Sequence, residues 1–460
     1  MEVPQPSAPK HWTENVLIKA VVIGVLILFL MIPSIMISEL VRERSYRKQE
    51  VVNEISSKWG SLQTISGPYI QIPYLEELKY NDGKNSEWRE HQLYYFPTTL
   101  DITGDVMPVV KKRSIFKAIL YEGQLNITGT FEYPDLKSLQ ILPENVQWEK
   151  ASMNIALTDL RGISSQVNLT LGDTLIKMTA SAQTGLSLPN GLRCLLPENL
   201  AANENFDFKI ALSIKGSQGL FFSPVARTNT VKISSSWPSP KFEGQFLPDT
   251  STISDKGFEA NWTVLDINRQ ISQQWTDANI RPFQNMDRSY YTGMPAYAST
   301  APAGAVDTPV FGVELLDTVD HYTKNERTVK YAFLLITLTF VVYFFCEVLK
   351  KQKVHPLQYA LVGAAIVIFF ILLLSLSEQI GFDAAYAVSS IATILLITFY
   401  SRSIFTEKKF AWSVAGLMFL QFGFIYVILQ LEDFALLAGS IALFLIIALI
   451  MYLTRKVKWS

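Results

Sequence analysis

The distribution of long apolar runs constrains this chain more than any other feature. One run covers residues 16–38 and is interrupted only by Lys19 in its first turn. At 1.5 Å per residue it matches the about 30 Å of a bilayer's hydrocarbon core, which predicts a spanning helix. The run ends without the small-residue cleavage pattern of a signal peptide, so we expect an uncleaved membrane anchor.

Five further apolar runs lie close together in the C-terminal part of the chain. Each is near the about 20 residues that a spanning helix needs, and none carries a charge at its middle. Together with the first run they predict six transmembrane helices, five of them in a bundle formed by residues 329–453. The five runs cover residues 329–349, 357–376, 382–400, 410–430 and 434–453.

Lysine and arginine alternate between the segments that join the last five runs, which predicts the orientation. Short basic loops stay in the cytoplasm, so residues 1–15 and 454–460 are expected inside and residues 39–328 outside. Four basic residues after the first run oppose this pattern, but long domains cross the membrane largely regardless of their charge. The three basic segments contain Lys350, Lys351 and Lys353, then Arg402, Lys408 and Lys409, then Arg455, Lys456 and Lys458.

The long segment between the first two predicted helices contains two kinds of sequence pattern, one helical and one typical of strands. Residues 39–58 lack Pro and Gly and place Glu43 and Arg47 at helical spacing, which predicts a helical stalk. Beyond Gly60, short alternating runs are separated by turn residues, which favours antiparallel strands packed as a sandwich. We therefore expect an α+β membrane protein whose six helices carry a large, mainly antiparallel β extracytoplasmic domain, inserted between helices one and two.

Composition and the lack of known motifs argue against nucleic-acid binding, metal binding and the common enzymatic activities. The net charge is −1, from 40 basic and 41 acidic residues, which lacks the basic footprint of a nucleic-acid binder. Two cysteines and four scattered histidines give no metal-ligand spacing, and no phosphate-binding or nucleophile motif is present. We identify no catalytic, cofactor-binding or metal-binding residue, which favours a non-enzymatic protein and leaves open an active site assembled from residues distant in the sequence.

Polar residues at the ends of the predicted helices are the candidate site in the membrane, because charge near hydrocarbon needs a partner or water. These residues either cap helices and join them by hydrogen bonds, or they form a ligand or ion site. They fall into two groups, which lie at opposite surfaces of the membrane. For Glu378 we expect hydrogen-bonding partners among Ser375, Ser377 and Tyr386. The candidates are Glu347, His355 and Gln358 at the inner surface, and Glu378 and Asp383 at the outer surface.

Two motifs stand out in the predicted outer domain. Residues 159–163 contain Asp159 and Arg161 beside a glycine, a combination typical of a tight turn. Residues 237–248 contain Trp237, Phe242 and Phe246, which are large apolar anchors. We expect both motifs to be turn and core features.

Several short motifs follow one another in the chain from about residue 39 to 400. They are residues 43–47, 59–60, 67–74, 159–163, 237–248, 326–340, 355–363 and 372–378. In sequence and in order these motifs resemble the CreD inner membrane family. One departure is Gln379, where the family often has His after Ser-Glu; this weakens a titratable or metal-binding role there.

The resemblance implies a bacterial inner-membrane protein linked to cell-envelope integrity and the stress response. Our leading hypothesis is a non-enzymatic protein whose periplasmic domain binds a protein partner or an envelope component. The alternative is a transporter or membrane-embedded enzyme that uses Glu347, His355, Glu378 and Asp383. In both cases the lipid bilayer is a partner and nucleic acid is not.

Overall fold

The computed structural model describes most of the chain in two compact units. One unit contains residues 1–49 and 319–460, and the other contains residues 50–318. The first division lies inside α1, because this helix continues well beyond the apolar run. The described residues are 16–79, 86–181, 190–197, 205–269, 271–277, 309–316, 321–350, 354–404, 408–431 and single positions at 437, 439, 440, 444, 448 and 451.

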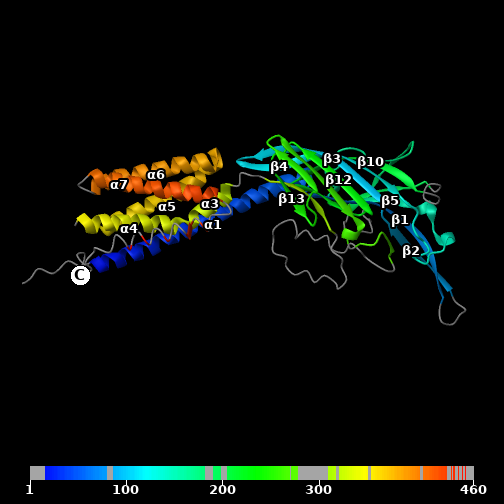
Figure 1. The fold of residues 1–460 in the computed structure, drawn as a ribbon, viewed down its shortest axis with the longest axis horizontal. Coiled ribbons are helices and arrows are strands. Elements are labelled where there is room, and N and C mark those ends of the chain that lie inside the picture. The colour runs from blue at the N-terminus through cyan, green and yellow to red at the C-terminus, as the bar shows by residue number, and fades with distance from the viewer. Residues whose placement is uncertain are drawn as a thin grey trace, which may run out of the picture. The chain divides into compact units, whose positions relative to one another are not determined.

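The first unit is built from helices (Figure 1). Helix α1 is uninterrupted from the first apolar run to the end of the predicted stalk, so its last ten residues belong to the second unit. The described helices are α1 (Val16–Trp59), α3 (His321–Lys330), α4 (Ala332–Lys350), α5 (Pro356–Ile380), α6 (Phe382–Ile404) and α7 (Lys408–Gln430).

Four of these helices are long and apolar enough to cross a membrane. They are α1, α5, α6 and α7, and the count over the described residues rises to five if α3 and α4 form one span bent by 42°. The run expected at residues 329–349 corresponds to α4, but the helix before it already starts at His321. The run expected at residues 434–453 lies almost entirely outside the described residues.

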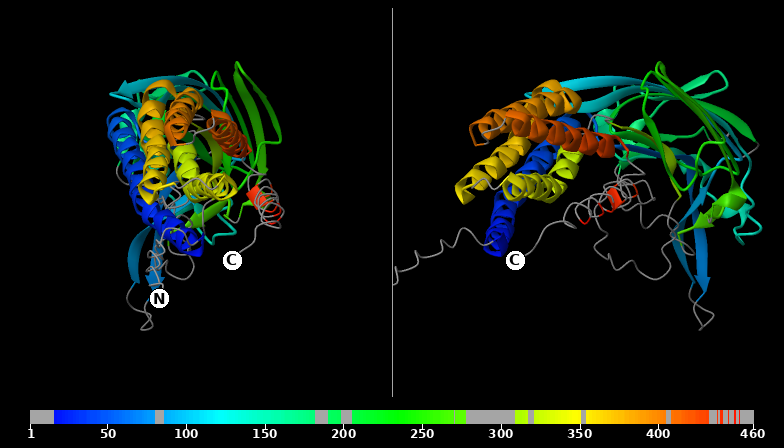
Figure 2. Two further views of the ribbon diagram at one scale, coloured as in Figure 1. Left: turned by 90° about the vertical axis from the view of Figure 1, so that its left-hand side faces the viewer. Right: turned by 60° about the vertical axis from the view of Figure 1, so that its left-hand side comes forward.

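Small and aromatic residues allow these helices to pack closely. A Cβ atom on Gly363 of α5 would lie 2.2 Å from Leu30 of α1 and 2.9 Å from Phe340 of α4, so the glycine permits both contacts. Phe369 of α5 lies 5.7 Å from the ring of Tyr386 on α6 and 4.8 Å from that of Phe422 on α7. The adjacent helices are visible in both views of Figure 2.

The second unit consists of two β-sheets. The described strands are β1 (Gln63–Lys79), β2 (Ser86–Tyr95), β3 (Thr99–Arg113), β4 (Phe116–Phe131), β5 (Ser152–Leu157), β6 (Asn168–Leu171), β7 (Thr174–Lys177), β8 (Thr179–Ser181), β9 (Asn190–Leu195), β10 (Phe206–Ser217), β11 (Gly219–Ser223), β12 (Thr228–Ser235), β13 (Pro240–Gly244), β14 (Thr250–Ser254), β15 (Gly257–Leu265), β16 (Gln274–Thr276) and β17 (Phe311–Leu315). Short 3-10 helices include η4 (Leu160–Gly162).

Strand order makes this a mixed β domain. The first sheet runs β13-β17-β11-β1-β5-β9-β8, with β2 joined to β1 and β16 to β2; the second runs β14-β15-β12-β3-β4-β10-β6-β7. Within the described strands, β1 pairs with β11 and β12 with β3 in parallel, whereas the other pairs are antiparallel. The parallel pairs join strands far apart in sequence, which alternation alone does not reveal.

Side chains from both sheets form one hydrophobic core. Ile65 and Ile155 of the first sheet belong to the same buried cluster as Ile127 and Ile233 of the second. Trp262 is 1% exposed and is one of the largest side chains in that cluster. A shared core between two sheet faces is the arrangement of a β-sandwich, and it gives this unit its own source of stability.

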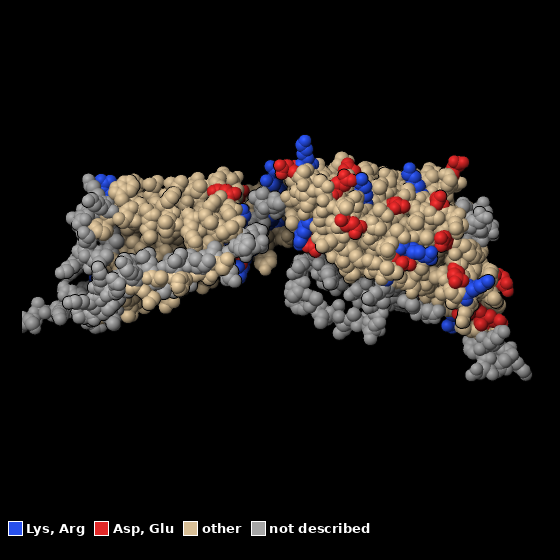
Figure 3. Space-filling view, viewed as in Figure 1, with Lys and Arg blue, Asp and Glu red and all other residues tan. Residues whose placement is uncertain are grey.

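Charge is distributed differently on the two units (Figure 3). On the face shown, the helical unit carries Lys, Arg, Asp and Glu mainly near the ends of its helices, and its middle is uncharged. The β unit displays both signs interspersed over its surface. This is the difference expected between a surface in contact with lipid and one in contact with water.

Candidate functional site

Glu347 is the centre of a buried polar cluster between helices α1, α4 and α5. Its side chain is 4% exposed and forms an ion pair with Lys19 of α1. The Tyr359 hydroxyl donates to Glu347 Oε2 at 3.0 Å, and the Val354 backbone N–H donates to Oε1 at 3.1 Å. Both carboxylate oxygens therefore have donors, which is what a charge this deeply buried requires.

The start of α5 positions part of this Glu347 cluster. His355 is the N-cap residue: its Nδ1 accepts from the Leu357 N–H at 3.2 Å, and Gln358 Oε1 accepts from the His355 N–H at 2.9 Å. Pro356 occupies the first helical turn, where its missing N–H costs little. This capping box sets the helix register that brings Tyr359 to Glu347.

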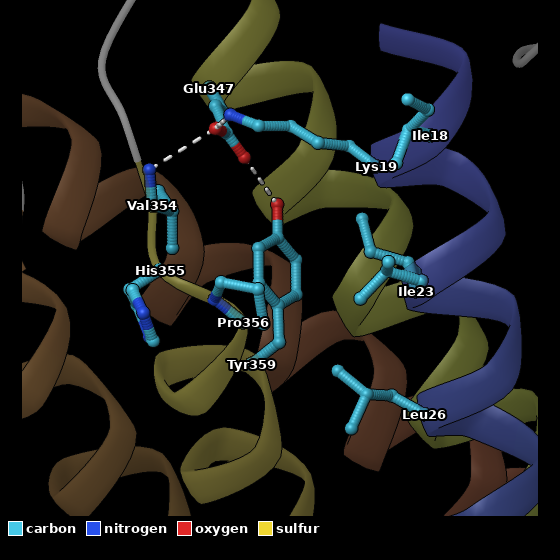
Figure 4. Close-up of a pocket in the computed structure, with 10 residues that line it drawn as sticks. Ile18, Lys19, Ile23, Leu26, Glu347, Val354, His355, Pro356 and Tyr359 are labelled. Atoms are coloured by element: carbon cyan, nitrogen blue, oxygen red, sulfur yellow. Dashed lines mark hydrogen bonds and ion pairs between the residues drawn. The ribbon is translucent and has the colours of Figure 1, made fainter. Parts of the chain in front are cut away.

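A cavity of about 360 Å³ adjoins the Glu347 cluster (Figure 4). Ile23 and Leu26 extend from α1 towards the side where Tyr359 lies, while Glu347 and Lys19 close one end. Its lining is apolar apart from that end. The lining residues are Ile18, Lys19, Val22, Ile23, Leu26, Glu347, Val354, His355, Pro356 and Tyr359.

Glu378 belongs to a second polar group at the other end of α5. The Tyr322 hydroxyl of α3 donates to Glu378 Oε1 at 3.0 Å, and Asn325 Nδ2 donates to Ser377 Oγ at 2.8 Å. Glu378 thus accepts a hydrogen bond from a neighbouring helix, as expected, but the donor is Tyr322 and not one of the expected residues Ser375, Ser377 and Tyr386. Tyr386 instead donates to the Phe422 carbonyl at 2.7 Å, because its ring is packed between α5 and α7.

Asp383 in the first turn of α6 ties that helix to α7. Its Oδ1 accepts from the Tyr426 hydroxyl at 3.1 Å and from Gln430 Nε2 at 2.9 Å. Like Glu378, this carboxylate is engaged by side chains from a neighbouring helix.

The structure does not bring the four candidate bundle residues together. Glu347 lies near the end of α4 and contacts Tyr359 in the first turn of α5, where His355 is the N-cap, whereas Glu378 lies in the last turn of α5 and Asp383 in the first turn of α6. From Tyr359 to Glu378 the helix rises by about 28 Å at 1.5 Å per residue. The two groups are therefore separate sites.

Asp159 and Arg161 of the outer motif join η4 to the end of α1 and to Ser61 after it. Asp159 caps η4, and its Oδ2 accepts from Arg161 Nη2 at 2.9 Å and from the Ser61 hydroxyl at 2.8 Å. Arg161 Nη1 in turn donates to the Ser57 carbonyl at 2.7 Å. A Cβ atom on Gly162 would lie 2.2 Å from the Lys215 carbonyl oxygen, so only glycine fits this turn.

These contacts also set the ionisation of Asp159. Burial raises the pKa of its carboxyl, but hydrogen bonds from Arg161 and Ser61 outweigh that effect and hold the pKa well below its usual range. A carboxylate this acidic and this fully occupied is a structural anchor and a poor proton acceptor.

The aromatic residues of the second outer motif pack against the core. Phe242 meets the ring of Trp262 edge-on at 5.7 Å, and Phe246 meets that of Phe311 at 6.0 Å. Trp237 is partly buried, and its indole N–H donates to the Leu316 carbonyl at 3.1 Å. The motif thus joins the end of β12 to the chain after β17.

The sequence-based candidates lack two residues that the structure places in these polar groups. Lys19 and Tyr322 complete the two polar groups, and their only signal was a polar or charged atom beside an apolar run. Within the described ranges, no three His, Cys, Asp or Glu side chains gather as they would around a metal ion.

A family model described as "Inner membrane protein CreD" matches residues 15–460. The chain belongs to the CreD family. Inner membrane protein CreD of Escherichia coli is 28% identical over 459 residues, which is 98% of this chain and 94% of the relative. This CreD family member is accordingly an inner membrane protein with several membrane-spanning helices.

Two solved structures that are similar to parts of this CreD family member do not bear on its assignment. An M1 zinc metallopeptidase mutant from Deinococcus radiodurans, bound to a Tyr-Ser-Ala substrate, is 8% identical with a TM-score of 0.16, covering 36% of this chain and 38% of the other. A second structure of that metallopeptidase is 10% identical with a TM-score of 0.19, covering 71% and 86%. Scores this low carry no argument about fold or activity.

Proposed function

We propose that this CreD family member supports cell-envelope integrity and the envelope-stress response without catalysing a reaction. In this proposal six helices anchor the protein, with both termini in the cytoplasm. The β domain lies in the periplasm, inserted between the first and second spans, where it binds a protein partner or an envelope component.

The observation that carries this proposal is the state of the bundle carboxylates. Glu347, Glu378 and Asp383 each accept hydrogen bonds from a neighbouring helix or loop, in groups at opposite ends of α5. An ion or proton pathway needs ionisable groups that face one route through the membrane. Because these carboxylates hold helices together, they favour a role of the helices as a membrane anchor. In this proposal the β domain is the part that binds a protein partner or an envelope component.

Cysteine labelling tests the orientation. Thr252→Cys in the exposed strand β14 and Ser403→Cys at the exposed end of α6 are made separately in a chain lacking Cys194 and Cys346. A membrane-impermeant maleimide applied to intact spheroplasts should label the first and spare the second. Labelling of Ser403→Cys alone would contradict the proposed topology.

Neutralising Glu378 and Asp383 distinguishes the proposed membrane anchor from the alternative, a transporter or membrane-embedded enzyme. Glu378→Gln combined with Asp383→Asn keeps acceptor oxygens for Tyr322, Tyr426 and Gln430 while removing both charges. In cells lacking the native protein, this variant should restore survival of envelope stress as the unaltered chain does. Lost survival at normal membrane abundance would favour the transporter or membrane-embedded enzyme.

A further inference from the structure

The cavity beside the Glu347 cluster is polar at one end and apolar along the rest of its length. Lys19 and Glu347 lie at its polar end (Figure 4), and His355 lines the cavity from the start of α5. From Lys19 to Leu26, helix α1 rises by about 10 Å at 1.5 Å per residue. Since α1 and α5 are membrane-spanning helices, the gradient runs from the headgroup level of the bilayer into its hydrocarbon core.

The polar end offers donors to a ligand. An ammonium has three N–H donors, and the contact with Glu347 uses one of those on Lys19, whose side chain is 22% exposed. His355 Nδ1 already accepts a backbone N–H, so the proton of the neutral imidazole lies on Nε2, which is also a donor. The N-terminus of α5 adds positive potential at the same end.

The one carboxylate at this end does not oppose an anion strongly. Glu347 is buried and already receives hydrogen bonds from Lys19, Tyr359 and the Val354 N–H. The groups that remain are therefore donors only, and they complement a phosphate group.

The apolar part fits a hydrocarbon chain. Val22, Ile23 and Leu26 line it from α1, and Pro356 and Tyr359 line it from α5. A small water-soluble anion would leave these walls without an apolar partner, whereas an acyl chain covers them.

We propose that this cavity binds an anionic phospholipid, with the phosphate at Lys19 and His355 and one acyl chain along Val22 and Leu26. The site is independent of the proposed role in envelope integrity, since it concerns binding by the helical unit alone. A lipid held between α1 and α5 would fill the space that their side chains leave open.

Binding is measured on the purified full chain in a neutral detergent, by native mass spectrometry during titration with dioleoyl phosphatidylglycerol or dioleoyl phosphatidylcholine. The unaltered protein should bind the phosphatidylglycerol about tenfold more tightly, which corresponds to about 1.4 kcal/mol. Equal affinity for the two lipids would overturn the proposal.

A matched pair of variants tests the acyl-chain position. Val22→Trp fills the cavity while leaving every residue of the Glu347 cluster unsubstituted, and should weaken phosphatidylglycerol binding about tenfold because the cavity is overpacked. Val25→Trp is the control, because Val25 is 60% exposed on α1 and does not line the cavity. Equal binding by the two variants would place the chain elsewhere and overturn the proposal.

The headgroup position has its own variant. Lys19→Met combined with Glu347→Gln removes both charges, leaves the net charge unchanged and keeps an acceptor for Tyr359. The preference for phosphatidylglycerol over phosphatidylcholine should disappear while phosphatidylcholine still binds. An unchanged preference would show that Lys19 does not bind the phosphate.

Two measurements on folding and ligand identity complete the test. Thermal unfolding without added lipid establishes that each variant is folded, and Leu26→Trp replaces Val22→Trp if the latter is not. Glycerol 3-phosphate, which has the anion without acyl chains, should fail to displace phosphatidylglycerol from the unaltered protein. Displacement at similar concentrations would identify a soluble phosphate site and overturn the lipid assignment.

Discussion

The hydroxyl of Tyr322 on α3 donates a hydrogen bond of 3.0 Å to Glu378 Oε1 in the last turn of α5. Tyr322 is 1% exposed, so its hydroxyl has little access to water. This contact links a short helix before the bent α3–α4 break to a membrane-spanning helix. It makes Glu378 a tie between helices.

Glu378→Leu should destabilise the helical unit. The substitution leaves the buried Tyr322 hydroxyl without this acceptor, which costs about 1–3 kcal/mol. Glu378→Gln keeps an acceptor oxygen and should cost less. Thermal unfolding of the purified chain in detergent, together with abundance in membranes, measures both effects.

Tyr322→Phe is the matched control for Glu378→Leu. Because both changes remove the same hydrogen bond, the double variant should lose less stability than the sum of the single variants. If Glu378→Gln is as harmful as Glu378→Leu, the charge itself is needed, and a proton or cation site replaces the helix tie.

Lys19→Met should be more damaging than replacing Lys19 and Glu347 together. Alone it leaves the carboxylate of Glu347, which is 4% exposed, without its cation, and breaking a buried pair costs about 3–5 kcal/mol. Lys19→Met with Glu347→Gln removes the uncompensated charge and should recover most of that loss. Unfolding temperatures in one detergent compare the two. Equal losses would mean that the uncompensated charge of Glu347 is not the cause of the destabilisation.

Asp159→Asn should destabilise the β unit in a pH-dependent way. Because the folded-state pKa of Asp159 lies below the usual value near 3.8, the unfolded state binds its proton first as the pH falls. The ionised carboxylate therefore contributes its full stability above that usual value, and the contribution is lost as the pH falls through the folded-state pKa. Unfolding temperatures across this range should show the gap between the two proteins closing in acid.

Asp255→Asn serves as the control for Asp159→Asn. Asp255 is an exposed turn residue between β14 and β15, so its replacement should leave the acid profile of the unaltered protein in place. A gap for Asp159→Asn that stays constant down to the lowest pH would contradict the role of its ionised form.

Trp237→Ala should destabilise the β unit by about 3 kcal/mol, at the low end for an aromatic truncation because the side chain is only partly buried. Trp237→Phe keeps most of the packing and loses the hydrogen bond to the Leu316 carbonyl, which costs about 1 kcal/mol. Thermal unfolding monitored by near-ultraviolet circular dichroism measures both.

Ile267→Ala is the control for general effects of truncation, because Ile267 is 84% exposed and should change stability by less than about 0.5 kcal/mol. If Trp237→Ala leaves the unfolding temperature unchanged while envelope-stress survival falls, Trp237 is a contact residue for a partner.

Features that depend on local composition are readable from the amino-acid sequence. Apolar length predicts the helices later seen as α5, α6 and α7, because a helix rises by a fixed amount per residue. The same constant rise predicts that Glu347, near the end of α4, and Glu378, in the last turn of α5, are separated by about one helix length. Turn residues and alternation likewise indicate a strand-rich domain between residues 60 and 316, because they act through the local backbone.

Contacts between groups far apart in the chain depend on how the whole chain packs. Lys19 and Glu347 are 328 residues apart, and the partner of Glu378 is Tyr322 rather than a residue of its own corner. The parallel pairing of β1 with β11 is also invisible in either strand alone. A periodic pattern tells which face of an element is apolar, but the neighbour that covers this face is selected by the packing of the whole chain.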